Sequence, residues 1–185
     1  MKFKLGIREI VAMGIGTALF VVLTTVQIPV FLIPNTFLQP RMAVLAFFSA
    51  AFGPIVGAVI GILGHALGDA IYYSSVWWSW VFPEAVVGLC LGLFAKQFEV
   101  REGGFAVTRN VILFNVIQII GNAIAWCVMA PLLDILVYSE PANKVFAQGT
   151  VAFVLNIVVI GFLGTVLLVA YSKIAGRQSG LKAED

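Results

Sequence analysis

The chain has 185 residues, of which 61% are hydrophobic and 11% are charged, and its mean hydropathy is +1.05. These values exclude an ordinary soluble globular domain, and a net charge of +2 without a strong basic patch excludes nucleic-acid binding. We therefore predict an all-α integral membrane protein, a single domain over residues 1–185 that forms a compact bundle of six transmembrane helices.

The predicted helices are the apolar segments long enough to cross a hydrocarbon core of about 30 Å. In chain order they cover about residues 9–27, 37–52, 54–73, 80–96, 110–129 and 144–171. The second has the least certain start, because counted from Met42 it holds only about eleven residues. The first ends at QIPVFLIPNTFLQPR, whose three prolines break the helical pattern and predict a long, partly apolar loop that suits a lid or a re-entrant segment.

The basic residues predict the orientation of the bundle. Nine of the eleven lie in three regions: Lys2, Lys4 and Arg8; Lys96, Arg101 and Arg109; Lys173, Arg177 and Lys182. Because Lys and Arg are in excess on the cytoplasmic side, we expect both termini and the loop at 96–109 to lie there. The two cysteines, Cys90 and Cys127, fall within predicted spans and are interpreted as buried apolar residues rather than a disulfide or metal pair.

A polar stripe marks the segment NVILFNVIQIIGNAIAWCVM, residues 110–129. At 100° per residue, four side chains fall within about 80° of one another: Asn115, Gln118, Asn122 and Trp126. Amides inside a membrane need hydrogen-bond partners. We therefore interpret the stripe either as hydrogen bonding between helices or as one wall of a ligand-binding site.

Glycines and an ionisable pair mark the segment 54–73. Four glycines, spaced by three or four residues, allow another helix to approach closely: Gly57, Gly61, Gly64 and Gly68. His65, Asp69 and Tyr72 share a helix face within about 60°. Because ionisable groups inside a membrane are costly, His65 and Asp69 are interpreted either as a structural pair or as ligand contacts.

Aromatic and charged residues surround the next predicted loop. Trp78 is interpreted as part of an interfacial belt or of the rim of a binding site. Glu84 adds a second acid near the same outer surface, where Arg41 and Lys144 are the only expected cations. Each of these charges is expected to be paired or bound to a ligand.

No motif in the sequence predicts catalysis or ATP binding. The chain lacks the patterns G-x-S-x-G, H-E-x-x-H and G-x-x-x-x-G-K-[ST]. We expect no enzyme activity, no cofactor and no metal, so that any ATP hydrolysis belongs to partner chains. Two alternatives remain open: a stand-alone proton- or ion-coupled carrier, and a membrane-embedded enzyme that uses His65 and Asp69.

Four stretches are distinctive: GIGTALFVVL; IPNTFLQPRMAVLAFFSAAFGPIVGAVIGILGHALGD; WWSWV; and APLLDILVYSEPANKVFAQGTVAFVLN. In them the chain resembles the riboflavin-type substrate-specific (S) components of energy-coupling factor (ECF) transporters, and the resemblance runs from about Ile10 to Tyr171. It implies a protein of the prokaryotic cell membrane that captures a vitamin or a related precursor from outside. A transmembrane T component and two ATPase A components would complete this ABC importer.

The resemblance also implies roles for particular residues. The loop that holds Asn35 and Gln39 matches the lid, and the stripe at residues 115–126 matches a wall of the site. The T component would dock on small residues of the first helix, which here are two pairs: Ala12 with Gly16, and Gly14 with Ala18. The candidate substrate-binding residues are Asn35, Gln39, Arg41, His65, Asp69, Tyr72, Trp78, Glu84, Asn115, Gln118, Asn122 and Trp126.

Aromatic rings and amides suit a flat heterocycle such as a flavin, which makes a riboflavin-like substrate the first expectation. A thiamine precursor, another vitamin or a methionine-related compound fits the same residue types.

Overall fold

The computed structural model describes residues 5–29 and 36–181, which form helices apart from one short hairpin. The N-terminal helix α1 (Ile7–Leu23) leads into the hairpin of β1 (Ile28–Pro29) and β2 (Phe37–Leu38). The two strands are antiparallel, with Ile28 opposite Leu38 and Pro29 opposite Phe37. The prediction of an all-α helical membrane protein is confirmed at the level of its class.

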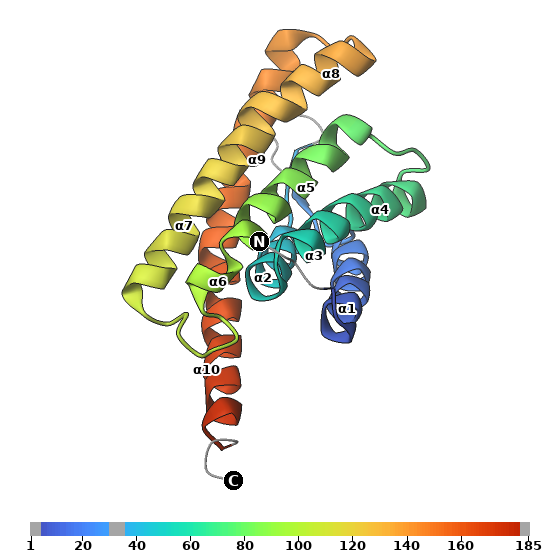
Figure 1. Cartoon of the computed structure of the whole chain (residues 1–185). Helices are drawn as coiled ribbons and strands as arrows, with labels where there is room; N and C mark the ends of the chain where they lie inside the picture. The colour runs from blue at the N-terminus through green and yellow to red at the C-terminus, as the bar shows by residue number, and fades with distance from the viewer. Residues whose placement is uncertain (1–4, 30–35, 182–185) are drawn as a thin grey trace.

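The remaining helices and π-helical turns follow in chain order. They are α2 (Arg41–Phe52), α3 (Pro54–Val59), the π-helical turn η1 (Ile60–Gly64), α4 (His65–Tyr72), α5 (Trp78–Leu93), α6 (Ala95–Phe98), α7 (Thr108–Asn122), the π-helical turn η2 (Ala123–Met129), α8 (Ala130–Tyr138), α9 (Ala142–Val159), the π-helical turn η3 (Ile160–Gly164) and α10 (Thr165–Leu181). Figure 1 shows α7 to α8 and α9 to α10 as two long antiparallel rods, beside which α1 to α5 form the rest of the bundle.

Three of the continuous helices described are long and apolar enough to cross a membrane: Pro54–Tyr72, Thr108–Tyr138 and Ala142–Arg177. The helices Arg41–Phe52 and Trp78–Leu93 are apolar but shorter. At a rise of 1.5 Å per residue, the 12 residues of α2 cover about 18 Å, which is less than the hydrocarbon thickness. The count of six spans therefore stays a prediction.

One predicted helix boundary is wrong, and the structure places a second one that the sequence left open between Thr36 and Met42. The segment predicted to end at residue 129 continues as helix to Tyr138, and Pro131 lies inside it, directly after the π-helical turn η2, a local adjustment that lets a membrane helix accommodate a proline. The segment predicted to begin at residue 37 begins as the strand β2, and its helix starts only at Arg41, after Pro40. The connection between α8 and α9 is consequently shorter than predicted.

Glycine allows a close helix approach between α3 to η1 and α5. A methyl group on Gly57 would lie 2.6 Å from the carbonyl oxygen of Gly88, and one on Gly61 would lie 2.8 Å from the backbone nitrogen of Ala85. The glycine pattern thus predicted this packing correctly. Its consequence is that His65, at the start of α4, comes next to Glu84 of α5.

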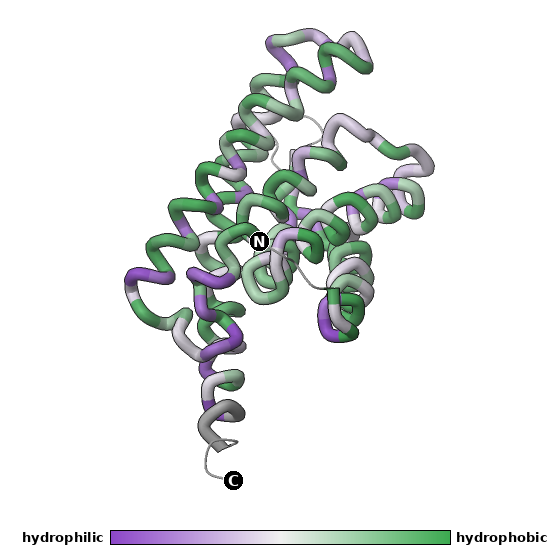
Figure 2. The backbone as a smooth tube through the Cα atoms, in the orientation of Figure 1, coloured by the Kyte–Doolittle hydropathy of each residue, from purple (hydrophilic) through white to green (hydrophobic). Residues whose placement is uncertain are grey.

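The exterior of the bundle is apolar, as expected for helices that face lipid. Large hydrophobic side chains such as Ile15, Ile112 and Phe162 are exposed. Figure 2 shows hydrophobic residues along most of the long helices and hydrophilic residues around the connection between α6 and α7. Cys90 and Cys127 are free thiols and only partly buried, so the expectation that they are buried holds only in part.

Candidate functional site

A cavity of about 310 Å³ lies where the hairpin, α4, α5, α8 and α9 meet. Six of the predicted substrate-binding residues line it: Gln39, Arg41, His65, Asp69, Glu84 and Trp126. Among the lining residues that the sequence prediction missed are Tyr73, Trp77, Trp80, Asp134, Gln148 and Asn156. The lining thus combines charged, amide and aromatic groups, which is the composition of a site for a polar small molecule.

A connected series of buried charged side chains lines the cavity. Nη2 of Arg41 lies 3.1 Å from Oε1 of Glu84. The imidazole of His65 places Nδ1 3.1 Å from Oε2 of Glu84 and Nε2 3.4 Å from Oδ1 of Asp69. All four side chains are buried. They come from α2, α4 and α5, so that the charges connect three helices.

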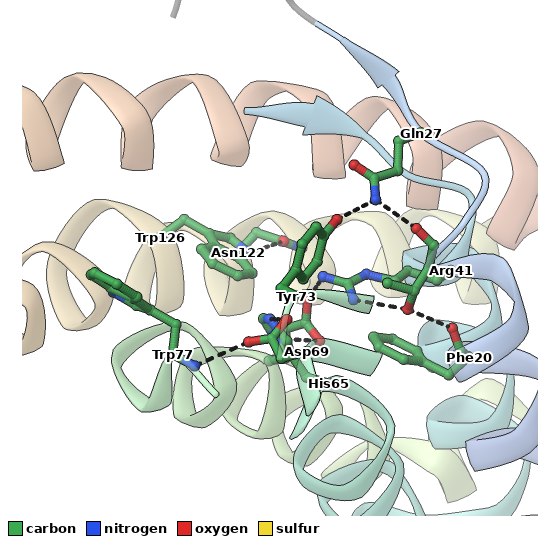
Figure 3. Close-up of polar contacts among 11 residues, drawn as sticks. Phe20, Gln27, Arg41, His65, Asp69, Tyr73, Trp77, Asn122 and Trp126 are labelled. Atoms are coloured by element: carbon green, nitrogen blue, oxygen red, sulfur yellow. Dashed lines mark hydrogen bonds and ion pairs between the residues drawn. The ribbon is translucent and has the colours of Figure 1, made fainter. Parts of the chain in front are cut away.

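Neighbouring groups contact both ends of this series of charged side chains. At one end Arg41 donates from Nη1 to Oγ1 of Thr24, at 3.2 Å, and its guanidinium lies 4.8 Å from the centre of the Phe20 ring. At the other end the backbone N–H of Trp77 donates to Oδ2 of Asp69, at 3.1 Å. Figure 3 shows the series of contacts, from Phe20 and Arg41 through His65 and Asp69 to Trp77. The charged side chains are therefore fixed before any ligand arrives.

Asp134 of α8 is a second anionic centre of the cavity. Its Oδ1 accepts from Nε1 of Trp77, at 2.7 Å, and from the hydroxyl of Ser79, and its Oδ2 accepts from Nε1 of Trp80, at 2.8 Å. The side chain is buried, with 2% exposure. An aspartate in the otherwise apolar run APLLDILVY was the sequence signal for this group.

The predicted amide stripe lies mostly outside the cavity. Nδ2 of Asn115 donates to the Val111 carbonyl and to Thr165, and Nε2 of Gln118 donates to the carbonyl of Ile157. Asn122 donates to Gln118 and accepts from Nε1 of Trp126, at 3.1 Å. Of the four, only Trp126 lines the cavity. These contacts favour the structural interpretation for the three amides, which hold helices together and fix the Trp126 indole.

Two further predicted residues do not line the cavity, and a third lies outside the described part of the chain. Tyr72 and Trp78 are absent from its lining, and their side chains are exposed. Asn35 lies outside the described residues. Gln39, from the same predicted lid, does line the cavity, as do Thr36 and Phe37 around strand β2.

The two small-residue pairs of α1 face opposite ways. Ala12 and Gly16 are buried, and a methyl group on Gly16 would lie 3.1 Å from a ring carbon of Phe48. Gly14 and Ala18 are exposed and line a shallow apolar groove between α1 and the α3 to α4 segment. A methyl group on Gly14 would meet nothing within 4 Å. Only the second pair is therefore open to a partner.

The arrangement can bind and orient a molecule, but it contains no evident catalytic set. The buried carboxylates are engaged with Arg41, His65 and the Trp77 and Trp80 donors. No described group of three or more His, Cys, Asp and Glu side chains is arranged to hold a metal ion.

Comparison with known proteins gives a family. The family profile described as "ECF-type riboflavin transporter, S component" matches residues 4–173. The chain is 49% identical over 177 residues to a UPF0397 protein of Exiguobacterium sp., covering 96% of each chain. It is 48% identical over 178 residues to a UPF0397 protein of Streptococcus gordonii, covering 96% of this chain and 95% of the relative.

A UPF0397 protein of Clostridium perfringens is 43% identical over 183 residues, which cover 99% of this chain and 98% of the relative. No solved structure matches the chain. The profile match extends over every described helix except the end of α10, and it includes all the residues that line the cavity. The chain belongs to the family of ECF-type riboflavin transporter S components.

Proposed function

We propose that this chain captures a vitamin-like small molecule from outside the cell and delivers it to an ATP-driven ECF importer in the cell membrane of a prokaryote. The observation that carries the proposal is the cavity of about 310 Å³ in a chain of this family, with five buried charged or ionisable side chains in its lining: Arg41, His65, Asp69, Glu84 and Asp134. Such a preorganised, partly aromatic pocket suits tight binding of a small molecule.

The residues proposed to contact the substrate are those that the sequence predicted as substrate-binding and that also line the cavity: Gln39, Arg41, His65, Asp69, Glu84 and Trp126. Trp126 lies 5.3 Å from Trp80, between ring centres, so that two indoles border the same space. Aromatic faces suit a flat heterocycle, and the surrounding polar groups suit hydrogen bonds to its edge. Riboflavin, named in the family description, is the first compound to test.

Delivery requires partners, which we propose to be a T component and two ATPase A components. The proposed docking surface is the groove that contains Gly14 and Ala18, because small side chains let another helix approach closely. Ala12 and Gly16 support that surface from inside the bundle.

Capture is tested on the purified chain. The protein is isolated from bacterial membranes in lipid nanodiscs, and the small molecules released on denaturation are identified by mass spectrometry. We expect one compound at near-stoichiometric amount. A folded preparation that carries and binds no small molecule contradicts the proposal.

Transport is tested in liposomes with the compound so identified. The chain alone should bind but not accumulate it, whereas liposomes that also contain the T and A components should accumulate it when ATP is supplied. Accumulation by the chain alone would instead support the stand-alone carrier. Chemical conversion of the compound by the chain alone would support the enzyme alternative.

The docking surface is tested with Gly14→Leu, which adds a large side chain at an open position. The variant should bind substrate like the wild type but should no longer co-purify with the T component. Leu19→Ala, on the exposed face of the same helix but outside the groove, is the matched control and should retain the partner. Undiminished co-purification of Gly14→Leu contradicts the proposed surface.

A further inference from the structure

We infer that the cavity selects an organic cation, that is, a small molecule with a positively charged nitrogen on an aromatic or apolar body. This inference rests on the proposed function, because it specifies the chemical class of the captured molecule. It depends on the charges around the cavity, on the surroundings of Asp134 and on the aromatic lining.

The cavity lining has an excess of negative charge. Four carboxylates line it, from Asp69, Glu84, Asp134 and Glu140, against two permanent cations, Arg41 and Lys144. The lining therefore carries a formal charge of −2 when His65 is neutral and −1 when it is protonated. Residues 30–35, VFLIPN, contain no charged side chain.

Asp134 is the carboxylate of the lining that has no basic side chain in ion-pair contact among the described residues. Glu84 is paired with Arg41, and Glu140 is paired with Lys144 at 2.6 Å. Asp69 has His65 as its neighbour. Asp134 takes part in no ion pair with any described residue, and its three donors, two indole N–H groups and a hydroxyl, are uncharged. A cation beside such a buried carboxylate compensates its charge, which no described side chain does.

Aromatic side chains surround the carboxylate of Asp134. Trp77 and Trp80 donate to Asp134, Trp126 lies against Trp80, and Trp77 stacks on Tyr138 with a ring-centre distance of 4.5 Å. The hydrogen bonds to Asp134 fix both indoles. Indole faces attract cations through their quadrupole, and the attraction grows when the cation is desolvated. Carboxylate and indoles thus favour the same kind of ligand.

Other ligand charges fit less well. A neutral heterocycle could stack on the indoles but would leave the charge of Asp134 without a counterion. A phosphorylated or carboxylated compound would bring a negative charge next to the excess of carboxylates. The volume of about 310 Å³ suits a small organic molecule.

The test uses one matched charge series and one set of vitamin compounds that differ in charge. Wild-type protein in nanodiscs is incubated with 1-methylnicotinamide, nicotinamide and nicotinate, and separately with thiamine, riboflavin and flavin mononucleotide. The retained compounds are measured by mass spectrometry, as is the charge at pH 7 of any co-purified molecule. We expect a cationic co-purified molecule, and at least tenfold more retention of the cation than of the neutral or anionic compound in each series that binds.

A neutral or anionic compound as the preferred or co-purified ligand overturns the inference but leaves capture intact. Retention of no compound in any arm overturns both the inference and the proposed function. The two failures are therefore distinguishable.

Asp134→Asn then tests the residue assignment. Retention of the cation should fall at least tenfold, while retention by Glu102→Gln, at an exposed position outside the cavity, should be unchanged. If Asp134→Asn does not fold, Glu140→Gln at the partly exposed edge of the cavity replaces it and should lower cation retention at unchanged thermal stability. Unchanged retention in a folded variant contradicts the role of these carboxylates.

Discussion

At the scale of single residues, the sequence identified the ionisable groups but not the connections between them. His65 and Asp69 were predicted to be neighbours because they are one helical turn apart. In the structure Nε2 of His65 lies 3.4 Å from Oδ1 of Asp69. Arg41 and Glu84 are separated by 43 residues, and no local pattern relates them. Their ion pair follows only from the packing of α2 against α5.

The Arg41–Glu84 pair gives the first stability prediction. Glu84→Gln removes the charge that compensates the buried guanidinium, and it should lower the free energy of unfolding by about 3 kcal/mol. Glu140→Gln is the control, because its partner Lys144 is 46% exposed, and it should cost less than about 1 kcal/mol. Equilibrium unfolding in mixed micelles measures both. Equal losses would mean that burial does not set the strength of the Arg41 pair.

The amides of α7 show how a helical pattern can predict a shared face but leave the role of its side chains open. The helical period placed Asn115, Gln118 and Asn122 on one face, but it did not distinguish a ligand from a neighbouring helix as their partner. The structure gives each amide a protein partner. Asn122→Leu should therefore reduce substrate binding only indirectly, by about 0.6 to 1.5 kcal/mol, through loss of its contact with Trp126.

A binding titration of Asn122→Leu, beside that of Trp126→Ala, checks this expectation. Trp126→Ala removes a cavity wall and should cost more than Asn122→Leu. A larger loss for Asn122→Leu would indicate direct contact between this amide and the substrate.

At the scale of elements, close helix packing and π-helical turns position the site. The turn η1 ends immediately before His65, and η2 contains Trp126. A π-helical turn changes the direction in which the following side chains point, and such turns are frequent at functional sites. No sequence pattern indicates these turns, because periodicity over a short window does not distinguish a wider turn from a regular one.

The second stability prediction concerns the glycine contact between η1 and α5. The added methyl group of Gly61→Ala would lie 2.8 Å from the backbone nitrogen of Ala85, so the helices must separate and the unfolding free energy should fall by about 1 to 3 kcal/mol. Gly14→Ala meets nothing within 4 Å and should be neutral or stabilising by up to about 1 kcal/mol. Thermal unfolding in detergent compares the two. A stable Gly61→Ala protein would contradict the described packing.

At the scale of the whole molecule, the α8 to α9 end of the bundle, which borders the cavity, lies opposite the end that carries the predicted cytoplasmic basic residues. The connection between α8 and α9, with Glu140 and Lys144, is remote in Figure 1 from the connection between α6 and α7 and from the C-terminal end of α10. Basic residues gather near the second end, at Lys96, Arg101 and Arg109. Because that end is predicted to be cytoplasmic, the cavity is expected to open near the outer surface.

This orientation is tested by labelling intact cells with a membrane-impermeant maleimide. In a chain whose two native cysteines are replaced by alanine, Asn143→Cys at the start of α9 should be labelled. Glu102→Cys, exposed at the other end, should be labelled only after the cells are opened. The reverse result would contradict the predicted topology and, with it, capture from outside.

The sequence by itself determined the class of this protein, because hydropathy and helical period are local properties that survive in any packing. It also determined the glycine stripe and the His65–Asp69 pair, which depend on one helix alone. Only the tertiary structure decided which of the polar residues share a cavity, since Arg41, Glu84 and Asp134 meet through contacts between distant segments. The same packing buried Ala12 and Gly16 and left Gly14 and Ala18 exposed, because the two pairs lie on different sides of one helix.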